Sequence, residues 1–229
     1  MKSKRYKNLL KEKKDMTPKP ISDLISKVKQ NCNTKFDESI DLSFQINNKQ
    51  KKGEVNIRTV VNMPSGTGKK IKIAVLCDES QKTSAKKAGA DIVGGDDLIE
   101  KIKGGEINFE KLICSPKKMV SLSKLGKILG PKGLMPNPKL GTVTDNVEKA
   151  VKDAKSGQVE VKNDKDGNIG VSIGKKSFTD DKILSNFDKI IETLEKEKGN
   201  NSFKGEMIKN VYLTSTMGIS YKLKLDKNF

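Results

Sequence analysis

The spacing of apolar residues changes twice along this chain of 229 residues, near Pro64 and again near Gly157. Before the first change, one stretch has the i, i+3, i+4 spacing of a helix and two stretches alternate like half-buried strands. Between the changes, near-continuous apolar strands alternate with helical segments, as in a sheet covered on both faces. After the second change, alternating strands return with one amphipathic helix. The sequence therefore predicts a mixed α/β and α+β protein of two domains: a discontinuous antiparallel α+β domain (21–65 plus 158–229) and an inserted three-layer α/β domain (66–157), preceded by a basic N-terminal arm (1–20).

The alternating stretches also predict how the strands of the discontinuous domain pair. Residues 39–47 and 54–63 are close in sequence, so we expect them to form a hairpin-like pair. Residues 158–174 are expected to form a second hairpin, because Asp166-Gly167 is typical of a tight turn that requires positive φ.

The net charge of +17 and the pI near 9.6 favour a polyanionic partner. Each phosphate that a lysine neutralises releases condensed counterions, which drives binding to nucleic acid. The alternative is a lysine-rich surface that is merely solvated.

The chain contains no histidine, which removes the commonest general acid–base group and most catalytic zinc sites. Its three cysteines are widely spaced without a C-x-x-C motif, and Cys77 and Cys114 stand in apolar runs where they are expected to be buried thiols. We therefore expect no catalytic residue, no metal site and no cofactor.

The sequence has no apolar run of the roughly 20 residues that span a bilayer, and its basic start lacks the apolar core of a signal peptide.

The stretch "PSGTGKK" at 64–70 resembles a phosphate-binding P-loop only in part. Met63 stands where the motif has its first glycine, and Lys70 stands where it has the hydroxyl that binds magnesium. A hinge between the domains fits better, with Gly66 and Gly68 at one crossing and Gly157 at the other. A small α/β enzyme acting on a phosphorylated substrate is the alternative that this motif leaves open.

The stretch "LGKILGPKGLMPNPKLGTVT" at 125–144 combines four glycines with three prolines. Prolines fix φ and lower the entropy of a long connection, so such a loop can be ordered without regular hydrogen bonding. Long ordered loops in compact domains tend to be functional. The loop has no carboxylate or thiol for chemistry, and it is expected to present backbone N–H groups and lysines.

This loop closely resembles the signature of the bacterial-type L-one family of large-subunit ribosomal proteins. Further stretches fall in the order and spacing of the family, and the resemblance runs from about Asp23 to Leu225. These stretches are "KFDESIDL", "AGADIVGGDDL", "INFEKLICSP", "AVKDAKSGQVE", "NDKDGNIG" and "TSTMG". The resemblance implies a split β-α-β-like discontinuous domain and a Rossmann-like inserted domain joined by a hinge.

The same resemblance implies a structural, non-enzymatic role in the large ribosomal subunit. Such proteins bind large-subunit rRNA at the mobile stalk beside the exit site and assist the movement and release of exit-site tRNA. Many also repress translation of their own operon by binding an mRNA that mimics the rRNA site. The expected location is a bacterial ribosome in the cytoplasm, with a mitochondrial or plastid ribosome as the alternative. An RNA-binding regulator outside the ribosome is a further alternative.

The residues expected to contact RNA are carried over from the resemblance. Two features of the sequence agree: Ser39 and Asp41 alternate with inward-facing residues, and the small residues of "TSTMG" suit close approach to the shallow minor groove of RNA. The expected contacts are Lys35, Phe36, Ser39, Asp41, Asp164, Lys165, Ser215, Thr216, Met217 and Gly218. A second surface facing rRNA or tRNA is expected in the long loop, at Lys127, Gly130, Lys132, Gly133 and Lys139.

Overall fold

The computed structural model describes residues 3–12, 17–47, 57–200 and 205–224. The chain forms two compact units. Unit 1 combines Met1–Gly68 with Val159–Phe229, and unit 2 is Lys69–Gln158. None of the helices in these described ranges is long and apolar enough to cross a membrane.

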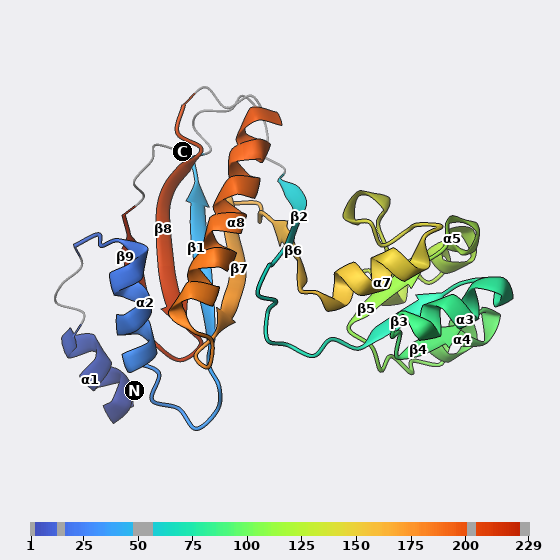
Figure 1. The fold of residues 1–229 in the computed structure, drawn as a ribbon, viewed down its shortest axis with the longest axis horizontal. Helices are drawn as coiled ribbons and strands as arrows, with labels where there is room; N and C mark the ends of the chain where they lie inside the picture. Colours follow the sequence, from blue (N-terminus) through green and yellow to red (C-terminus); the bar gives the residue numbers. More distant parts are fainter. Residues whose placement is uncertain (1–2, 13–16, 48–56, 201–204, 225–229) are drawn as a thin grey trace. The chain divides into compact units, whose positions relative to one another are not determined.

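Unit 1 is built on a four-stranded antiparallel sheet with the strand order β7-β1-β8-β9. Helices α2 and α8 lie across one face of this sheet (Figure 1). A separate two-stranded sheet pairs β2 with β6. The elements are α1 (Lys4–Glu12), α2 (Ile21–Gln30), β1 (Ser39–Ile46), β2 (Arg58–Asn62), β6 (Gln158–Lys162), β7 (Asn168–Lys175), α8 (Asp180–Asn200), β8 (Ile208–Ser215) and β9 (Tyr221–Leu223).

The period-two pattern of β1 decides which face of the sheet is covered. Ile40, Leu42, Phe44 and Ile46 are buried against the helices, whereas Asp41 and Ser43 point to the opposite, polar face. Helix α8 contributes its own apolar side chains to this core at helical spacing. The core holds Ile183, Phe187, Ile190 and Leu194 from α8 with Leu24, Ile25 and Val28 from α2.

Unit 2 has a three-stranded parallel sheet in the order β4-β3-β5. The central strand β3 is buried along its whole length, because one core cluster lies on each side of the sheet. Helices α4, α5 and α6 supply one cluster, and α3 and α7 supply the other. The elements are β3 (Ile73–Leu76), α3 (Glu79–Lys87), β4 (Ile92–Gly94), α4 (Asp96–Lys103), β5 (Lys111–Cys114), α5 (Pro116–Ser123), α6 (Gly126–Leu129), the 3-10 helix η2 (Pro138–Leu140) and α7 (Val147–Lys155). This parallel sheet, alongside the antiparallel sheet of unit 1, confirms the predicted mixed α/β and α+β class.

The predicted hairpin of the two N-terminal strands is wrong. Strand β1 pairs with β7 and β8, and β2 pairs with β6. The turn expected between them, at 48–53, lies outside the described residues. The prediction of the second hairpin is confirmed at its turn, where Gly167 has a φ of 83° and Asp164 O accepts the Gly167 N–H. Its two strands nevertheless belong to different sheets; beside the turn they are joined by a bridge between Asn163 and Ile169 and by the Asp164 N–H, which donates to Asn168 O at 2.9 Å.

Candidate nucleic-acid interface

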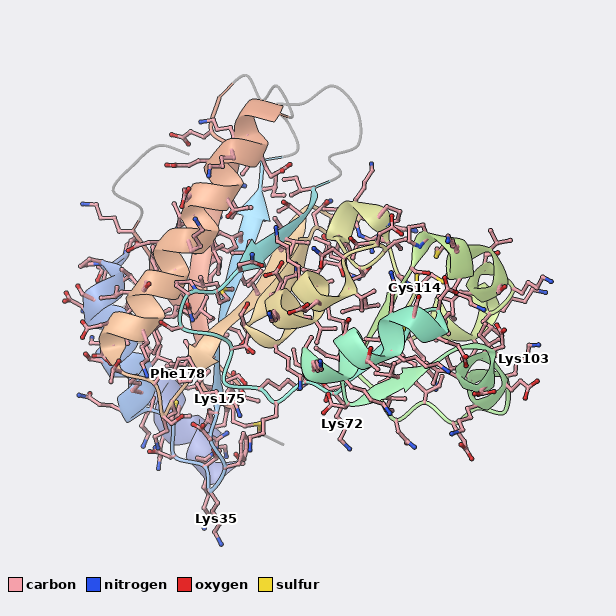
Figure 2. All side chains as sticks on the ribbon, turned by 45° about the vertical axis from the view of Figure 1, so that its right-hand side comes forward. Lys35, Lys72, Lys103, Cys114, Lys175 and Phe178 are labelled. Carbon is pink, nitrogen blue, oxygen red and sulfur yellow. The ribbon has the colours of Figure 1, made fainter. Side chains whose placement is uncertain are left out.

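Two large apolar side chains are exposed at the end of the unit 1 sheet where β1 begins and β8 ends. Phe36 is 51% exposed in the segment before β1, and Met217 is 47% exposed in the turn after β8. The antiparallel register pairs Ile40 with Ser215 and so brings this segment and this turn to the same place. Lys35 is exposed there too and points away from the unit (Figure 2). The predicted contacts at Lys35, Phe36 and Met217 therefore share one surface.

The carboxylate of Glu38 joins the segment to the turn from beneath this surface. Its side chain is fully buried; Oε1 accepts the Thr34 hydroxyl at 2.8 Å and Oε2 accepts the Met217 N–H at 3.1 Å. Burial alone would raise the pKa of Glu38, but the hydrogen bonds from the Met217 N–H and the Thr34 hydroxyl hold it below its ordinary value. Glu38 is therefore ionised at neutral pH and fixes the position of the Met217 backbone.

Thr216 and Ser39 form a second link between the turn and β1. The Ser39 N–H donates to Thr216 Oγ1 at 3.0 Å, and the Thr216 N–H donates to Ser39 O at 3.1 Å. Both residues therefore hold the turn in place through their polar groups.

The turn also depends on the absence of a side chain at Gly218. The Gly218 N–H donates to Ser215 O at 3.1 Å, and a Cβ atom at Gly218 would lie 2.3 Å from Ser215 Oγ. Ser215 itself is 3% exposed, so its hydroxyl lies beneath the surface beside Glu38 rather than on it.

Asp41 lies on the polar face of the sheet, opposite Ser172 on β7 and Thr214 on β8. It is half-buried, and this burial raises the pKa of its carboxyl, with partial compensation from the Ser172 hydroxyl. The polar face of β1 thus leads from the Phe36–Met217 surface toward the far end of the sheet.

Asp164 and Lys165 lie at that far end, in the turn before β7. The register pairs Ser39 with Lys175 and Gln45 with Asn168, so the length of β1, about 20 Å at 3.4 Å per residue, separates them from the first surface. Asp164 accepts hydrogen bonds from the Asn168 N–H at 2.6 Å and its side-chain amide at 3.1 Å, which lower the pKa of its carboxyl. Lys165 is exposed. The predicted RNA contacts of unit 1 therefore form two groups rather than one.

The predicted loop surface lies in unit 2 and is ordered by its own contacts. Asn137 N–H donates to Thr142 Oγ1 at 2.7 Å, and the Asn137 side chain accepts the Lys139 N–H at 2.9 Å. Leu129 and Leu140 are buried beneath the loop. Lys127, Lys132 and Lys139 are exposed. Gly130 is packed too closely for a side chain, since a Cβ there would lie 2.6 Å from Gly126 O, and Gly133 has a φ of 68°.

The three predicted hinge glycines all have positive φ: 69° at Gly66, 70° at Gly68 and 102° at Gly157. Gly66 and Gly68 are fastened within unit 1. The Asn186 side chain donates to Gly66 O at 3.0 Å and to Ile173 O at 2.7 Å, and accepts the Ser65 N–H at 3.1 Å. A Cβ at Gly68 would lie 2.9 Å from the Phe178 ring.

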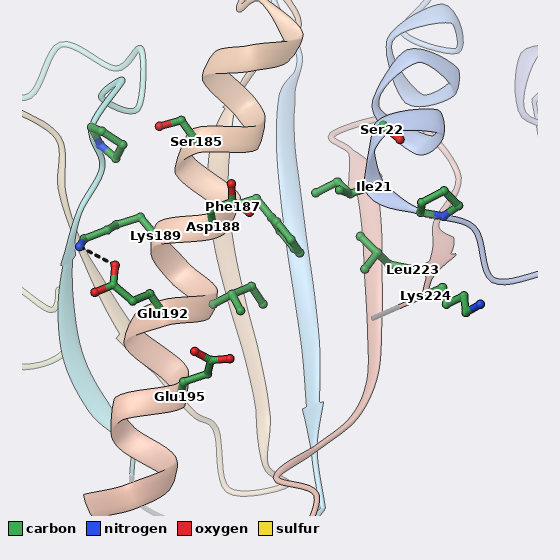
Figure 3. A pocket seen from close by; sticks show the side chains of 13 residues that line it. Ile21, Ser22, Ser185, Phe187, Asp188, Lys189, Glu192, Glu195, Leu223 and Lys224 are labelled. Atoms are coloured by element: carbon green, nitrogen blue, oxygen red, sulfur yellow. Dashed lines mark hydrogen bonds and ion pairs between the residues drawn. The ribbon is translucent and has the colours of Figure 1, made fainter. Parts of the chain in front are cut away.

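A groove of about 700 Å³ lies elsewhere in unit 1, between α2 and α8 (Figure 3). Ile21 and Leu223 face Phe187 across it, and the carboxylates of Asp188, Glu192 and Glu195 lie along α8. Lys189 is paired with Glu192 at 2.7 Å. The groove includes none of the predicted contacts, and its carboxylates would repel a phosphorylated substrate. Among the described residues, no group of three or more acidic or cysteine side chains is placed to hold a metal ion.

The sequence patterns missed two buried polar residues that organise these sites. Glu38 has the same parity as Ile40 and Leu42, so the period-two pattern would have placed it on the buried face. Asn186 stands three residues after Ile183 and four before Ile190, on the apolar face of α8. A polar residue at an inward position was the available signal in both cases.

The sequence matches the ribosomal protein L1p/L10e family over residues 28–219. It is 67% identical over 227 residues to the large ribosomal subunit protein uL1 of Pelagibacter ubique (strain HTCC1062), covering 99% of both chains. It is 43% identical over 223 residues to the large ribosomal subunit protein uL1c of Arabidopsis thaliana, covering 97% of this chain and 64% of that protein. Identity to the large ribosomal subunit protein uL1 of Rickettsia africae (strain ESF-5) is 42% over 205 residues, covering 90% and 85%. These matches confirm the resemblance carried by the long loop and the shorter motifs, and the chain belongs to the ribosomal protein L1p/L10e family.

Proposed function

We propose that this protein binds large-subunit rRNA at the mobile stalk beside the exit site through the surface around Phe36 and Met217. Membership of a ribosomal protein family makes the chain a structural constituent of the large ribosomal subunit and not an enzyme. The finer assignment is supported by the chemistry of unit 1 and by the charge of +17.

The observation that carries the proposal is the exposure of Phe36 and Met217 on a rigid base. Apolar side chains of this size are normally buried, and exposed ones that gather at one place indicate a contact surface. Glu38 and the links between Thr216 and Ser39 fix the backbone beneath them, so the surface exists before the partner arrives. A preformed apolar surface flanked by Lys35 suits stacking on nucleotides or close approach to an RNA minor groove.

The second group, at Asp164 and Lys165, would contact the same RNA further along. About 20 Å corresponds to several nucleotides of an A-form strand, so one RNA element lying along the polar face of β1 could reach both groups. In this group, Lys165 is the phosphate contact, and Asp164 shapes the turn through Asn168.

Two further activities belong to the proposal. The exposed lysines of the unit 2 loop would meet rRNA or exit-site tRNA and assist tRNA release. The Phe36–Met217 surface would also bind an mRNA of similar shape and so repress the protein's own operon. The expected location is the ribosome of the bacterial cytoplasm, with an organellar ribosome as the alternative that a plastid relative supports.

Filter binding to a transcript of the stalk segment tests the central claim. Met217→Asp places a charge on the contact and is expected to weaken binding at least about tenfold; Phe36→Ala is expected to cost about five- to a hundredfold if its ring stacks on a base. Val120→Asp is the matched control, because Val120 is 73% exposed and lies in unit 2. Unchanged affinity of Met217→Asp would exclude this surface.

Co-sedimentation with large subunits distinguishes a ribosomal protein from a regulator that acts elsewhere.

A further inference from the structure

Helix α1 belongs to unit 1, packs on its core and reaches the Met217 turn. Leu9 is 3% exposed in the main core, and Tyr6 and Leu10 pack against the same core. Arg5, one turn before Leu9, donates from Nη2 to Met217 O at 2.8 Å. The arm is therefore attached to the surface proposed above, 212 residues away in sequence.

Arg5 and Glu38 hold the two polar backbone groups of Met217 with opposite charges. The N–H points to the Glu38 carboxylate and the C=O to the Arg5 guanidinium, an arrangement in which both hydrogen bonds are charge-assisted. Arg5 Nη1 is buried without a hydrogen-bond partner among the described residues. Arg5 is thus a positioning residue that ties α1 to the turn.

The outward face of α1 is strongly basic. Lys4, Lys7 and Lys11 are all exposed, and their i, i+3, i+7 spacing places them in one row. At 1.5 Å per residue the row is about 10 Å long, which matches the axial rise of about three nucleotides of a strand.

Charged side chains of both signs surround the Met217 turn. Asp37, Glu38 and Asp41 place three carboxylates at this end of the sheet, where Lys35 and Lys176 are exposed cations; the Lys176 N–H donates to Glu38 O at 2.8 Å. The carboxylates repel a polyanion that approaches Phe36 and Met217, and Lys35 and Lys176 attract it. Basic groups on a neighbouring element can offset the repulsion.

We propose that α1 is a second RNA-contacting element, in which Lys4, Lys7 and Lys11 bind phosphates that flank the RNA held at Met217, while Arg5 fixes the helix in position. This inference rests on the proposed rRNA contact. It assigns a partner to the N-terminal arm, namely the phosphate backbone of the RNA, which the lysines would bind whatever the base sequence.

The test measures affinity for the stalk transcript across a series of salt concentrations in the full chain. Each lost phosphate contact lowers the slope of log affinity against log salt by about 0.9. The triple variant Lys4→Ala/Lys7→Ala/Lys11→Ala is expected to lower the slope by about 2 to 3 and to bind at least about tenfold more weakly. The triple variant Lys86→Ala/Lys101→Ala/Lys103→Ala removes the same charge from exposed positions in unit 2 and should leave the slope unchanged.

Arg5 needs a separate comparison, because its role is to position the helix. Arg5→Ala is expected to lower both the affinity and the slope and to speed amide hydrogen exchange in α1, and Arg5→Lys should restore part of each. If Arg5 only stabilised the Met217 turn, Arg5→Ala would weaken binding without changing the slope of log affinity against log salt.

The outcomes separate this inference from the function on which it rests. If Met217→Asp abolishes binding but the α1 triple variant keeps the wild-type slope, the rRNA surface stands and the role of α1 is refuted. If Met217→Asp binds like wild type, the proposed surface fails and α1 cannot flank it. Loss of affinity in Met217→Asp together with a reduced slope in the α1 variant supports both.

Discussion

Glu38 carries a negative charge into the interior of unit 1, and pH therefore acts on the site through this residue. Its folded-state pKa lies below the ordinary value of 4.5 because hydrogen bonds outweigh the effect of burial. A carboxylate with a lowered pKa stabilises the folded state fully above its ordinary pKa. That stabilisation is lost as the pH falls through the folded pKa.

The substitution Glu38→Gln should remove this pH dependence. An amide keeps the shape but offers only one acceptor oxygen, so we expect the free energy of unfolding to fall by about 1–3 kcal/mol at pH 7. The difference from wild type should stay constant down to about pH 5 and shrink at lower pH, as Glu38 of the wild type becomes protonated. Urea denaturation at several pH values between 7 and 3 measures it.

Asp41→Asn is a control for which the opposite change in stability is expected. Burial raises the pKa of Asp41, so its ionised form costs stability above the folded pKa, and that cost disappears as the pH falls. The asparagine variant should therefore be as stable as wild type or more stable at pH 7. If both variants lose stability equally at neutral pH, the charge of Glu38 is not what stabilises the turn.

At the scale of elements, Asn186 shows how one helix fastens a loop. Its side chain binds Gly66 O, Ile173 O and the Ser65 N–H from within α8, where it is fully buried. These bonds connect α8 to β7 and to the residues that precede unit 2. Losing them would leave backbone groups without partners in a partly buried place.

Asn186→Ala is therefore expected to lower the free energy of unfolding by about 2–4 kcal/mol. The neighbouring Ser185 is exposed on the same helix, and Ser185→Ala should change stability by less than about 0.5 kcal/mol. Thermal or urea unfolding of the two variants provides the comparison. A loss in Asn186→Ala no larger than in Ser185→Ala would mean that the Gly66 segment is held by other contacts.

Element types could be predicted from the sequence because each depends on a local period. The alternation of Ile40, Leu42, Phe44 and Ile46 identifies β1 and its buried face without any knowledge of its partners. The partners could not be deduced, because β7 and β8 follow β1 in the chain by more than a hundred residues and the period does not encode which strand is adjacent. Proximity in sequence favoured the hairpin with residues 54–63, and that prediction is wrong.

The candidate site was predictable in a similar, partial way. The family motifs indicated Phe36 and Met217, whose exposure the structure describes. They did not indicate Glu38 or Arg5, because the hydrogen bonds of these residues to Met217 arise only when distant segments meet. A contact between Arg5 and Met217 has no local signal in either segment.

At the scale of the whole molecule, the three cysteines are buried and unpaired. Burial raises the pKa of each thiol, to about 11 for Cys114, so little thiolate is present at pH 7. We expect the folded protein to react slowly with Ellman's reagent and to release all three thiols on unfolding. Rapid reaction of the native protein would show that one unit opens readily. Slow reaction would allow new surface cysteines to be labelled selectively.

Such labels can test the proposed hinge. Asn186 and Phe178 hold the chain to unit 1 at Gly66 and Gly68. Unit 2 holds the chain from Lys72 onward, where Lys72 O accepts the Glu110 N–H at 2.9 Å, and the Lys69 side chain is paired with Glu110 at 3.0 Å. The crossing between these anchors is short, and Gly157 stands at the second crossing with a φ of 102°. Two short crossings beside anchored residues would let the units turn as rigid bodies.

Spin labels at Ser185→Cys in unit 1 and Lys103→Cys in unit 2 should therefore give a broad distribution of distances by double electron–electron resonance in the protein without RNA. Both positions are exposed, so the labels should not disturb the fold. A pair within unit 2, Lys103→Cys with Lys149→Cys, provides the control and should give a narrow distribution, because both helices pack on one sheet. Equally narrow distributions for both pairs would mean that the units are held in one arrangement and that the glycines at the crossings serve only to turn the chain.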